Sequence, residues 1–161
     1  MYTKQYNRTE AAAYAAEWAF KRNPQYLNFD NMGGDCTNFT SQCIYAGSGV
    51  MNPVKTFGWY YYSSYDRAPA WTGVQYLYNF LIGNKGIGPF AQETERSQVQ
   101  PGDIVQLGTT EGSYYHSPFI VAVNGNEIFV AAHSDDAYMR PLSTYSYGSA
   151  RFLKIEGVRV N

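Results

Sequence analysis

Cysteine and histidine are scarce in this sequence of 161 residues, which contains two of each. Two cysteines are too few for a disulfide framework. Cys36 and Cys43 also fall seven residues apart in a predicted helix, which separates their Cα atoms by about 10 Å, beyond the roughly 7 Å limit of a disulfide. The sequence therefore predicts two free thiols.

Long hydrophobic runs and excess charge are also missing. No stretch of about 18 apolar residues exists, so we expect no membrane span. The first ten residues lack the apolar core of a signal peptide, so any secretion signal is expected outside this sequence. The formal net charge of −1 excludes the basic surface that a nucleic-acid partner requires. Charged residues make up 16% and aromatic residues 17%, which favours a polar, uncharged surface typical of an extracellular protein.

The hydrophobic pattern changes from helical to alternating along the chain. Asn7 and Glu10 have the form of a capping box before an alanine-rich helix. Helical patterns cover residues 7–23, 36–46 and 71–81, and Gly47 is expected to end the second of them. Alternating patterns cover residues 104–107, 116–123, 127–133 and 150–160. Helices followed by strands indicate a single α+β domain over residues 1–161, with N-terminal helices packed on a C-terminal antiparallel sheet.

Cys36 is the first candidate for chemistry, since it begins a predicted helix directly after Gly33 and Gly34. Unpaired N–H groups and the helix dipole at such a position favour thiolate over thiol. The two glycines allow a close approach to the sulfur. Cys43 lies inside the same helix and is expected to be a buried apolar residue.

The two histidines are expected to lie side by side. Asn124-Gly125 is typical of a two-residue hairpin turn, and this turn would place His116 directly opposite His133, with Cβ atoms about 5 Å apart. A thiol, an imidazole base and a group that orients the base are the parts of a nucleophilic triad. The sequence thus predicts Cys36 as nucleophile, His116 as base and His133 as orienting residue.

Three segments in the same order resemble a known family. They are residues 33–43 (GGDCTNFTSQC), 101–106 (PGDIVQ) and 116–121 (HSPFIV). They are similar to the nucleophile motif, a turn and strand, and the catalytic-histidine strand of amidase domains related to the NlpC/P60 and CHAP families. Those are papain-like cysteine amidases and peptidases, many of which act on bacterial cell-wall peptides. The resemblance implies a papain-like fold, a peptide or peptidoglycan substrate, no cofactor and an extracellular location.

The resemblance also implies residues that support the nucleophile and the base. Residues 132–135 (AHSD) resemble the place of the third polar residue of the family, and Asp135 or Asn126 are alternatives to His133 in that role. Some relatives use a tyrosine upstream of the cysteine, which corresponds to Tyr26 here. Asp35, directly before Cys36, is a further candidate for support.

Substrate binding is expected on two walls beside the nucleophile. One is the aromatic segment that supplies Trp59 and Tyr60, together with Trp71, and the other is the Asn- and Gly-rich loop at residues 28–34. Aromatic side chains could form such a wall for a peptide or a glycan.

Two other classes of function are consistent with the same residues. One is a non-catalytic module that binds cell walls on the same fold. The other is a zinc site with Cys36, His116 and His133 as ligands and Asp135 or water as the fourth. The spacing of these residues lacks the short paired motifs of structural zinc sites, so we expect no metal. We also expect a monomer.

Overall fold

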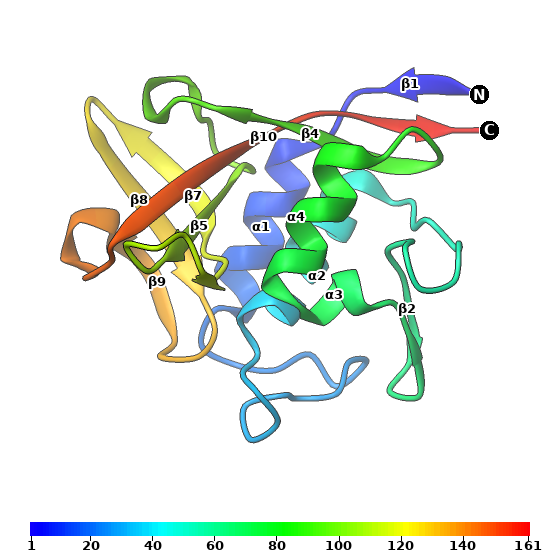
Figure 1. The fold of residues 1–161 in the computed structure, drawn as a ribbon, viewed down its shortest axis with the longest axis horizontal. Helices are drawn as coiled ribbons and strands as arrows, with labels where there is room; N and C mark the ends of the chain where they lie inside the picture. The colour runs from blue at the N-terminus through cyan, green and yellow to red at the C-terminus, as the bar shows by residue number, and fades with distance from the viewer.

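The computed structural model describes all residues 1–161 as an α+β fold, in which helices pack beside a curled antiparallel sheet (Figure 1). The predicted α+β class is therefore confirmed. The helices are α1 (Arg8–Trp18), α2 (Cys36–Ser48), α3 (Pro69–Thr72) and α4 (Val74–Gly83), with short 3-10 turns η1 (Arg96–Gln98) and η2 (Leu142–Thr144). None of these helices combines the length and the hydropathy needed to cross a membrane.

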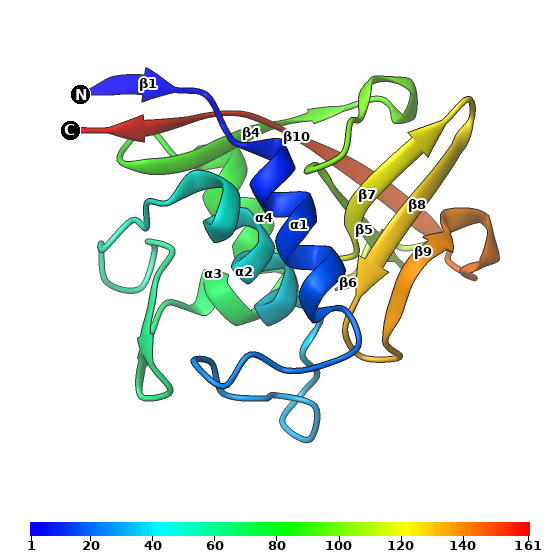
Figure 2. The ribbon, with the colours of Figure 1, turned by 180° about the vertical axis from the view of Figure 1, so that it is seen from behind.

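Eight of the ten strands form one sheet. The strands are β1 (Tyr2–Lys4), β2 (Tyr61–Ser63), β3 (Asp66–Arg67), β4 (Gly88–Thr94), β5 (Ile104–Gly108), β6 (Tyr114–His116), β7 (Phe119–Asn124), β8 (Glu127–Ala132), β9 (Ala137–Pro141) and β10 (Ser149–Val160). The main order is β1-β10-β5-β7-β8-β9, with β4 paired to β10 and β6 to β5. Because β1 pairs with β10, the two chain ends lie side by side (Figure 2).

The N-terminal half of the helical layer forms much as its sequence predicts. The Asn7 side chain accepts a hydrogen bond from the Glu10 N–H at 3.0 Å and so caps α1, which ends at Trp18, earlier than predicted. Gly47 was expected to end α2, but the helix continues to Ser48 and is capped by Gly49, which has a φ of 67°. A Cβ on Gly47 would lie 2.7 Å from the Asn7 carbonyl oxygen, so this glycine permits close contact between α1 and α2.

The large aromatic residues form the core. The main hydrophobic cluster lies between the helices and one face of the sheet, and a smaller cluster packs on the opposite face. Trp59 and Trp71 are fully buried with ring centroids 4.7 Å apart, and Tyr60 is buried as well. These three residues therefore do not form the predicted substrate-binding wall, because their side chains are buried and not accessible to a substrate.

The β7–β8 hairpin differs from the predicted register. Asn124 pairs with Glu127, so the turn consists of Gly125 and Asn126. The expected strand 116–123 is also interrupted, since His116 ends β6, which pairs with β5, and β7 begins only after Pro118. The prediction that His116 and His133 lie opposite each other is therefore wrong.

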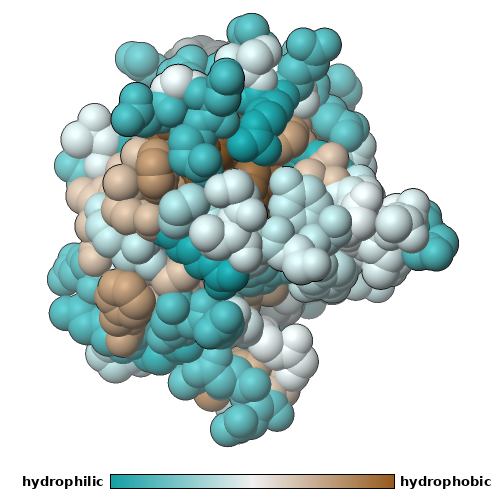
Figure 3. Space-filling view, turned by 90° about the vertical axis from the view of Figure 1, so that its left-hand side faces the viewer, coloured by the Kyte–Doolittle hydropathy of each residue, from teal (hydrophilic) through white to brown (hydrophobic).

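The surface on one side of the molecule is largely hydrophilic. The side of the molecule shown in Figure 3 is covered mainly by hydrophilic residues and residues of intermediate hydropathy, with hydrophobic residues gathered in small areas. Both cysteines are free thiols buried in α2.

Candidate active site

Cys36 occupies the first position of α2, as the sequence predicts. The chain reaches it through Gly33 and Gly34, whose φ angles of 97° and 106° suit glycine. The Asp35 N–H donates a hydrogen bond of 2.9 Å to the Ser134 hydroxyl in the β8–β9 turn. A Cβ on Gly34 would lie only 3.2 Å from the same hydroxyl oxygen. The glycine loop therefore brings the start of α2 against that turn.

Ser117 connects α2 to the histidine strand. The Thr40 hydroxyl donates to the Ser117 carbonyl at 2.5 Å, and the Thr37 hydroxyl donates to the Ser117 hydroxyl at 3.3 Å. Gln106 on β5 donates a third hydrogen bond, of 3.1 Å, to the same hydroxyl. Since Ser117 directly follows His116, these contacts hold the end of β6, and with it His116, at the N-terminus of α2.

Cys36 and His116 consequently line one open pocket of about 400 Å³. Its other lining residues come from the glycine loop, from β6, and from the segment between β8 and η2 and just beyond it: Gly33, Gly34, Tyr115, Ser134, Asp135, Arg140 and Tyr145. The predicted nucleophile, the predicted base and Asp135 thus face the same space. Arg140 and Tyr145 are pocket residues that the sequence did not indicate.

Burial keeps the Cys36 thiol protonated at neutral pH. Burial raises its pKa, while the Thr37 hydroxyl and the backbone N–H groups of Ser117 and Thr37 act in the opposite direction. Burial prevails, so the pKa lies above the ordinary thiol value. The polar groups around the sulfur are nevertheless arranged to stabilise a thiolate once it forms.

His116 is neutral at the same pH. Burial, reinforced by the positive charge of Arg140 and opposed by the Asp135 carboxylate, lowers the pKa of the imidazole to about 4. The ring packs against Tyr145 with a centroid separation of 5.9 Å. A neutral imidazole can accept a proton, so the two side chains form a thiol and a base before any substrate arrives.

His133 lies behind the pocket and has other partners. Its Nδ1 is 2.5 Å from the Asp35 carboxylate, and its Nε2 is 2.8 Å from the Trp18 carbonyl oxygen. Both partners are acceptors, so Nε2 donates its proton and another proton lies between Nδ1 and the carboxylate. With both nitrogens engaged, His133 cannot orient His116, and the predicted third role is not supported by this geometry.

Asp35 connects the first turn of α2 to the loop before it. Its buried carboxylate accepts hydrogen bonds from the Phe29 N–H and the Asn38 amide, each 2.9 Å long. Burial alone would raise the pKa of Asp35, but the hydrogen bonds to His133, Asn38 and Phe29 lower it below its ordinary value. The Arg22 Nε lies 3.6 Å away. Asp35 is therefore an ionised anchor beside Cys36.

Two other predicted residues lie outside the pocket. Tyr26 packs against Trp71, with ring centroids 6.0 Å apart, and is part of the aromatic cluster. Asn126 lies in the β7–β8 turn, at the opposite end of that hairpin from His133. Asp135 does line the pocket, so of the two alternatives to His133 only Asp135 is near His116.

The side chains proposed as zinc ligands do not form a common site. No group of three or more His, Cys, Asp or Glu side chains has an arrangement that could hold a metal ion. His133 in particular is bonded to Asp35 and to Trp18, so it does not join Cys36 and His116 as a common ligand group.

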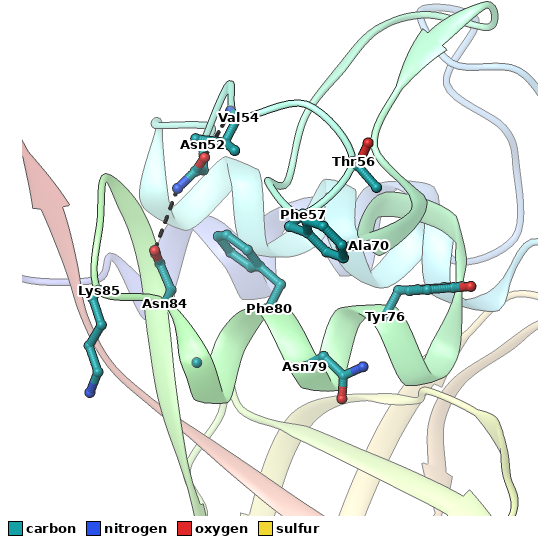
Figure 4. Close-up of a pocket in the computed structure, with 11 residues that line it drawn as sticks. Asn52, Val54, Thr56, Phe57, Ala70, Tyr76, Asn79, Phe80, Asn84 and Lys85 are labelled. Atoms are coloured by element: carbon teal, nitrogen blue, oxygen red, sulfur yellow. Dashed lines mark hydrogen bonds between the residues drawn. The ribbon is translucent and has the colours of Figure 1, made fainter.

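A second pocket, of about 320 Å³, lies between α4 and the loop that follows α2 (Figure 4). Phe57 and Phe80 face each other across it, and Asn52 and Asn84 are hydrogen-bonded at one end. It shares no lining residue with the Cys36 pocket, and it holds neither a cysteine nor a histidine.

The chain matches the family described as "Putative amidase domain" over residues 5–155 and belongs to that family, which points to amide hydrolysis. It is 32% identical over 140 residues to the uncharacterized protein YhbB of Bacillus subtilis (strain 168), a match that covers 84% of this chain and 44% of that protein. The chain thus spans less than half the length of this relative. No solved structure matches the chain, so the papain-like relationship stays a prediction.

Proposed function

We propose that this protein is a cysteine amidase or peptidase that hydrolyses amide bonds through a thioester on Cys36. The observation that carries the proposal is that a cysteine at a helix N-terminus and a neutral histidine line one open pocket. Membership of the amidase family adds independent support.

The pocket residues divide the reaction into two steps. His116 takes the proton from the Cys36 sulfur as the thiolate attacks the amide carbonyl carbon, and the unpaired N–H groups of the first turn of α2 stabilise the resulting oxyanion. His116 returns the proton to the leaving amine as the C–N bond breaks. Water, deprotonated by His116, then attacks the thioester and releases the acid and the free thiol.

We propose bacterial cell-wall peptides as the substrate class and the cell wall or extracellular space as the location. The resemblance of the cysteine and histidine segments to the NlpC/P60 and CHAP families supports this choice. The relative from a bacterium agrees with it, as does the low charge content of the sequence.

The test is digestion of purified peptidoglycan and of synthetic stem peptides in H₂¹⁸O. We expect one new amine and one new carboxyl group per cleavage, with one ¹⁸O atom in the acid product detected by mass spectrometry. Added hydroxylamine should divert part of the acyl group to a hydroxamate, because it competes with water for the thioester. Sedimentation with cell walls but no cleavage of any amide would favour the binding module instead.

The pH dependence of kcat/KM reports the pKa of the proposed base, His116. Only unprotonated His116 can accept the thiol proton, and its pKa of about 4 keeps it unprotonated at neutral pH. We expect kcat/KM to stay near its maximum down to about pH 5 and to fall by half near the pKa of the base. Circular dichroism at each pH serves as the control for unfolding. An acid limb near the ordinary histidine value of about 6.5 would contradict the buried environment of His116.

A further inference from the structure

Arg140 provides the Cys36 pocket with its only permanent positive charge. It projects from β9 into the space that Cys36 and His116 also line, and no lysine or other arginine lines that pocket. His116 is neutral because its pKa is about 4. A negatively charged group that enters the pocket would therefore meet one fixed cation.

Thr144 and Tyr145 hold the Arg140 guanidinium in place. Its Nε donates to the Thr144 hydroxyl at 2.8 Å, and its Nη2 donates to the Thr144 carbonyl at 3.1 Å. The group also lies 3.6 Å above the centre of the Tyr145 ring. These contacts fix the fork before a ligand binds, which reduces the entropy lost on binding. The remaining Nη1 has a single charged neighbour, the Asp135 carboxylate at 3.5 Å.

The pair with Asp135 is weak enough to be replaced. The Asp135 side chain is 91% exposed, and ion pairs in such a solvated position contribute about 0–1 kcal/mol. Arginine binds carboxylates with two parallel hydrogen bonds, so a substrate carboxylate can replace Asp135 at this guanidinium. An incoming anion would then take the position that the Asp135 carboxylate holds beside Arg140.

We propose that Arg140 binds a carboxylate of the substrate close to the scissile amide, and that the protein therefore prefers acidic peptides to their neutral amide analogues. This inference rests on the proposed function and names the substrate class of the same pocket. A bound carboxylate would also offset the positive charge that Arg140 exerts on His116, which makes proton transfer from Cys36 easier.

Alkylation of Cys36 tests the anion site without any turnover. Iodoacetate and iodoacetamide have nearly the same shape, and in both cases the thiolate displaces iodide, but only iodoacetate carries a carboxylate. The ratio of the two rate constants at Cys36, measured by mass spectrometry, is compared with the ratio for glutathione. We expect the Cys36 ratio to be higher by about 10- to 100-fold, as a hydrogen-bonded charge pair would give.

Three variants separate Arg140 from general charge effects. Arg140→Gln should reduce the ratio to that of glutathione. Arg140→Lys keeps the positive charge and should retain part of the preference, so it provides a second test if the glutamine variant folds poorly. Asp135→Asn removes the competing carboxylate and should increase the ratio; asparagine tolerates the φ of 70° at this position. Arg96→Gln is the charge-matched control, because Arg96 bonds to Asn126 at the far hairpin turn, and it should leave the ratio unchanged.

Peptide pairs that differ only by Glu or Gln beside the cleaved bond complete the test. We expect the wild type to favour the acidic peptide by a similar factor in kcat/KM, and Arg140→Gln to lose this preference. Equal preference in the wild type and in Arg140→Gln, with both reagents and both peptides, would overturn the assignment even if amides are hydrolysed. An Arg140-dependent iodoacetate preference in a protein that cleaves no amide would support the anion site and contradict the proposed function.

Discussion

Replacement of Cys36 with alanine is expected to lower amide hydrolysis by at least about 10⁴-fold, because the loss of a catalytic nucleophile leaves only binding and oxyanion stabilisation. The fold should be retained. The side chain is small and lines an open pocket, and the one side-chain group that its sulfur contacts is the Thr37 hydroxyl, at a long distance of 3.7 Å. Product formation from stem peptides in the digestion assay, with circular dichroism on the same samples, measures both effects.

Cys43 offers the matched control within the same helix. It is fully buried among hydrophobic residues and lines none of the pocket. Cys43→Ala should therefore leave kcat/KM close to the wild-type value and lower the melting temperature slightly, since it opens a small cavity. Full activity in Cys36→Ala, or equal activity losses in the two variants, would be incompatible with a Cys36 thioester.

The largest effect on stability is expected at His133. Its replacement with alanine leaves the buried Asp35 carboxylate without its closest hydrogen-bond partner. Breaking a buried pair in this way costs about 3–5 kcal/mol. The stacked contact with Phe39, at a centroid distance of 4.1 Å, is lost as well. Urea unfolding of His133→Ala, followed by tryptophan fluorescence, measures the change in the free energy of unfolding.

A double-mutant cycle shows whether the cost belongs to the pair. His133→Ala should cost clearly less in the Asp35→Asn background, because the neutral amide needs no counter-charge. If His133 instead oriented the base, its removal would shift the pH profile of kcat/KM. We expect folded His133→Ala to keep the acid limb of the wild type. A stability unchanged by His133→Ala would contradict the buried pair.

The nucleophile and its helix could be predicted because their signals are local. Two glycines before Cys36 and a helical pattern after it are features of adjacent residues, and the structure places Cys36 at the first position of α2. The α+β class follows similarly from the change of hydrophobic period along the chain.

The relative position of the histidines could not be predicted, because it depends on register. A one-residue shift of the β7–β8 turn, an irregularity between Ile120 and Ala122, and the break at Pro118 together move His116 onto β6, away from His133. None of these features has a strong local signal except the proline, which lacks the N–H that a central strand needs.

The rest of the pocket depends on tertiary contacts. Arg140 and Tyr145 reach Cys36 only because the segment after β8 folds back beside the glycine loop. The buried partner of His133 is Asp35, 98 residues earlier in the chain. In contrast, Trp59 and Trp71 looked like binding residues by composition, but nothing in their local sequence showed that the core would enclose them.

Stepwise alkylation relates the modification of Cys36, the proposed nucleophile, directly to activity. The protein is alkylated with iodoacetamide, and each sample is analysed for the fraction of Cys36 modified and for the remaining hydrolysis of a stem peptide. We expect activity to fall in proportion to Cys36 modification and to reach zero at one label per chain, with Cys43 unlabelled. Hydrolysis that persists when Cys36 is fully alkylated would contradict Cys36 as the nucleophile.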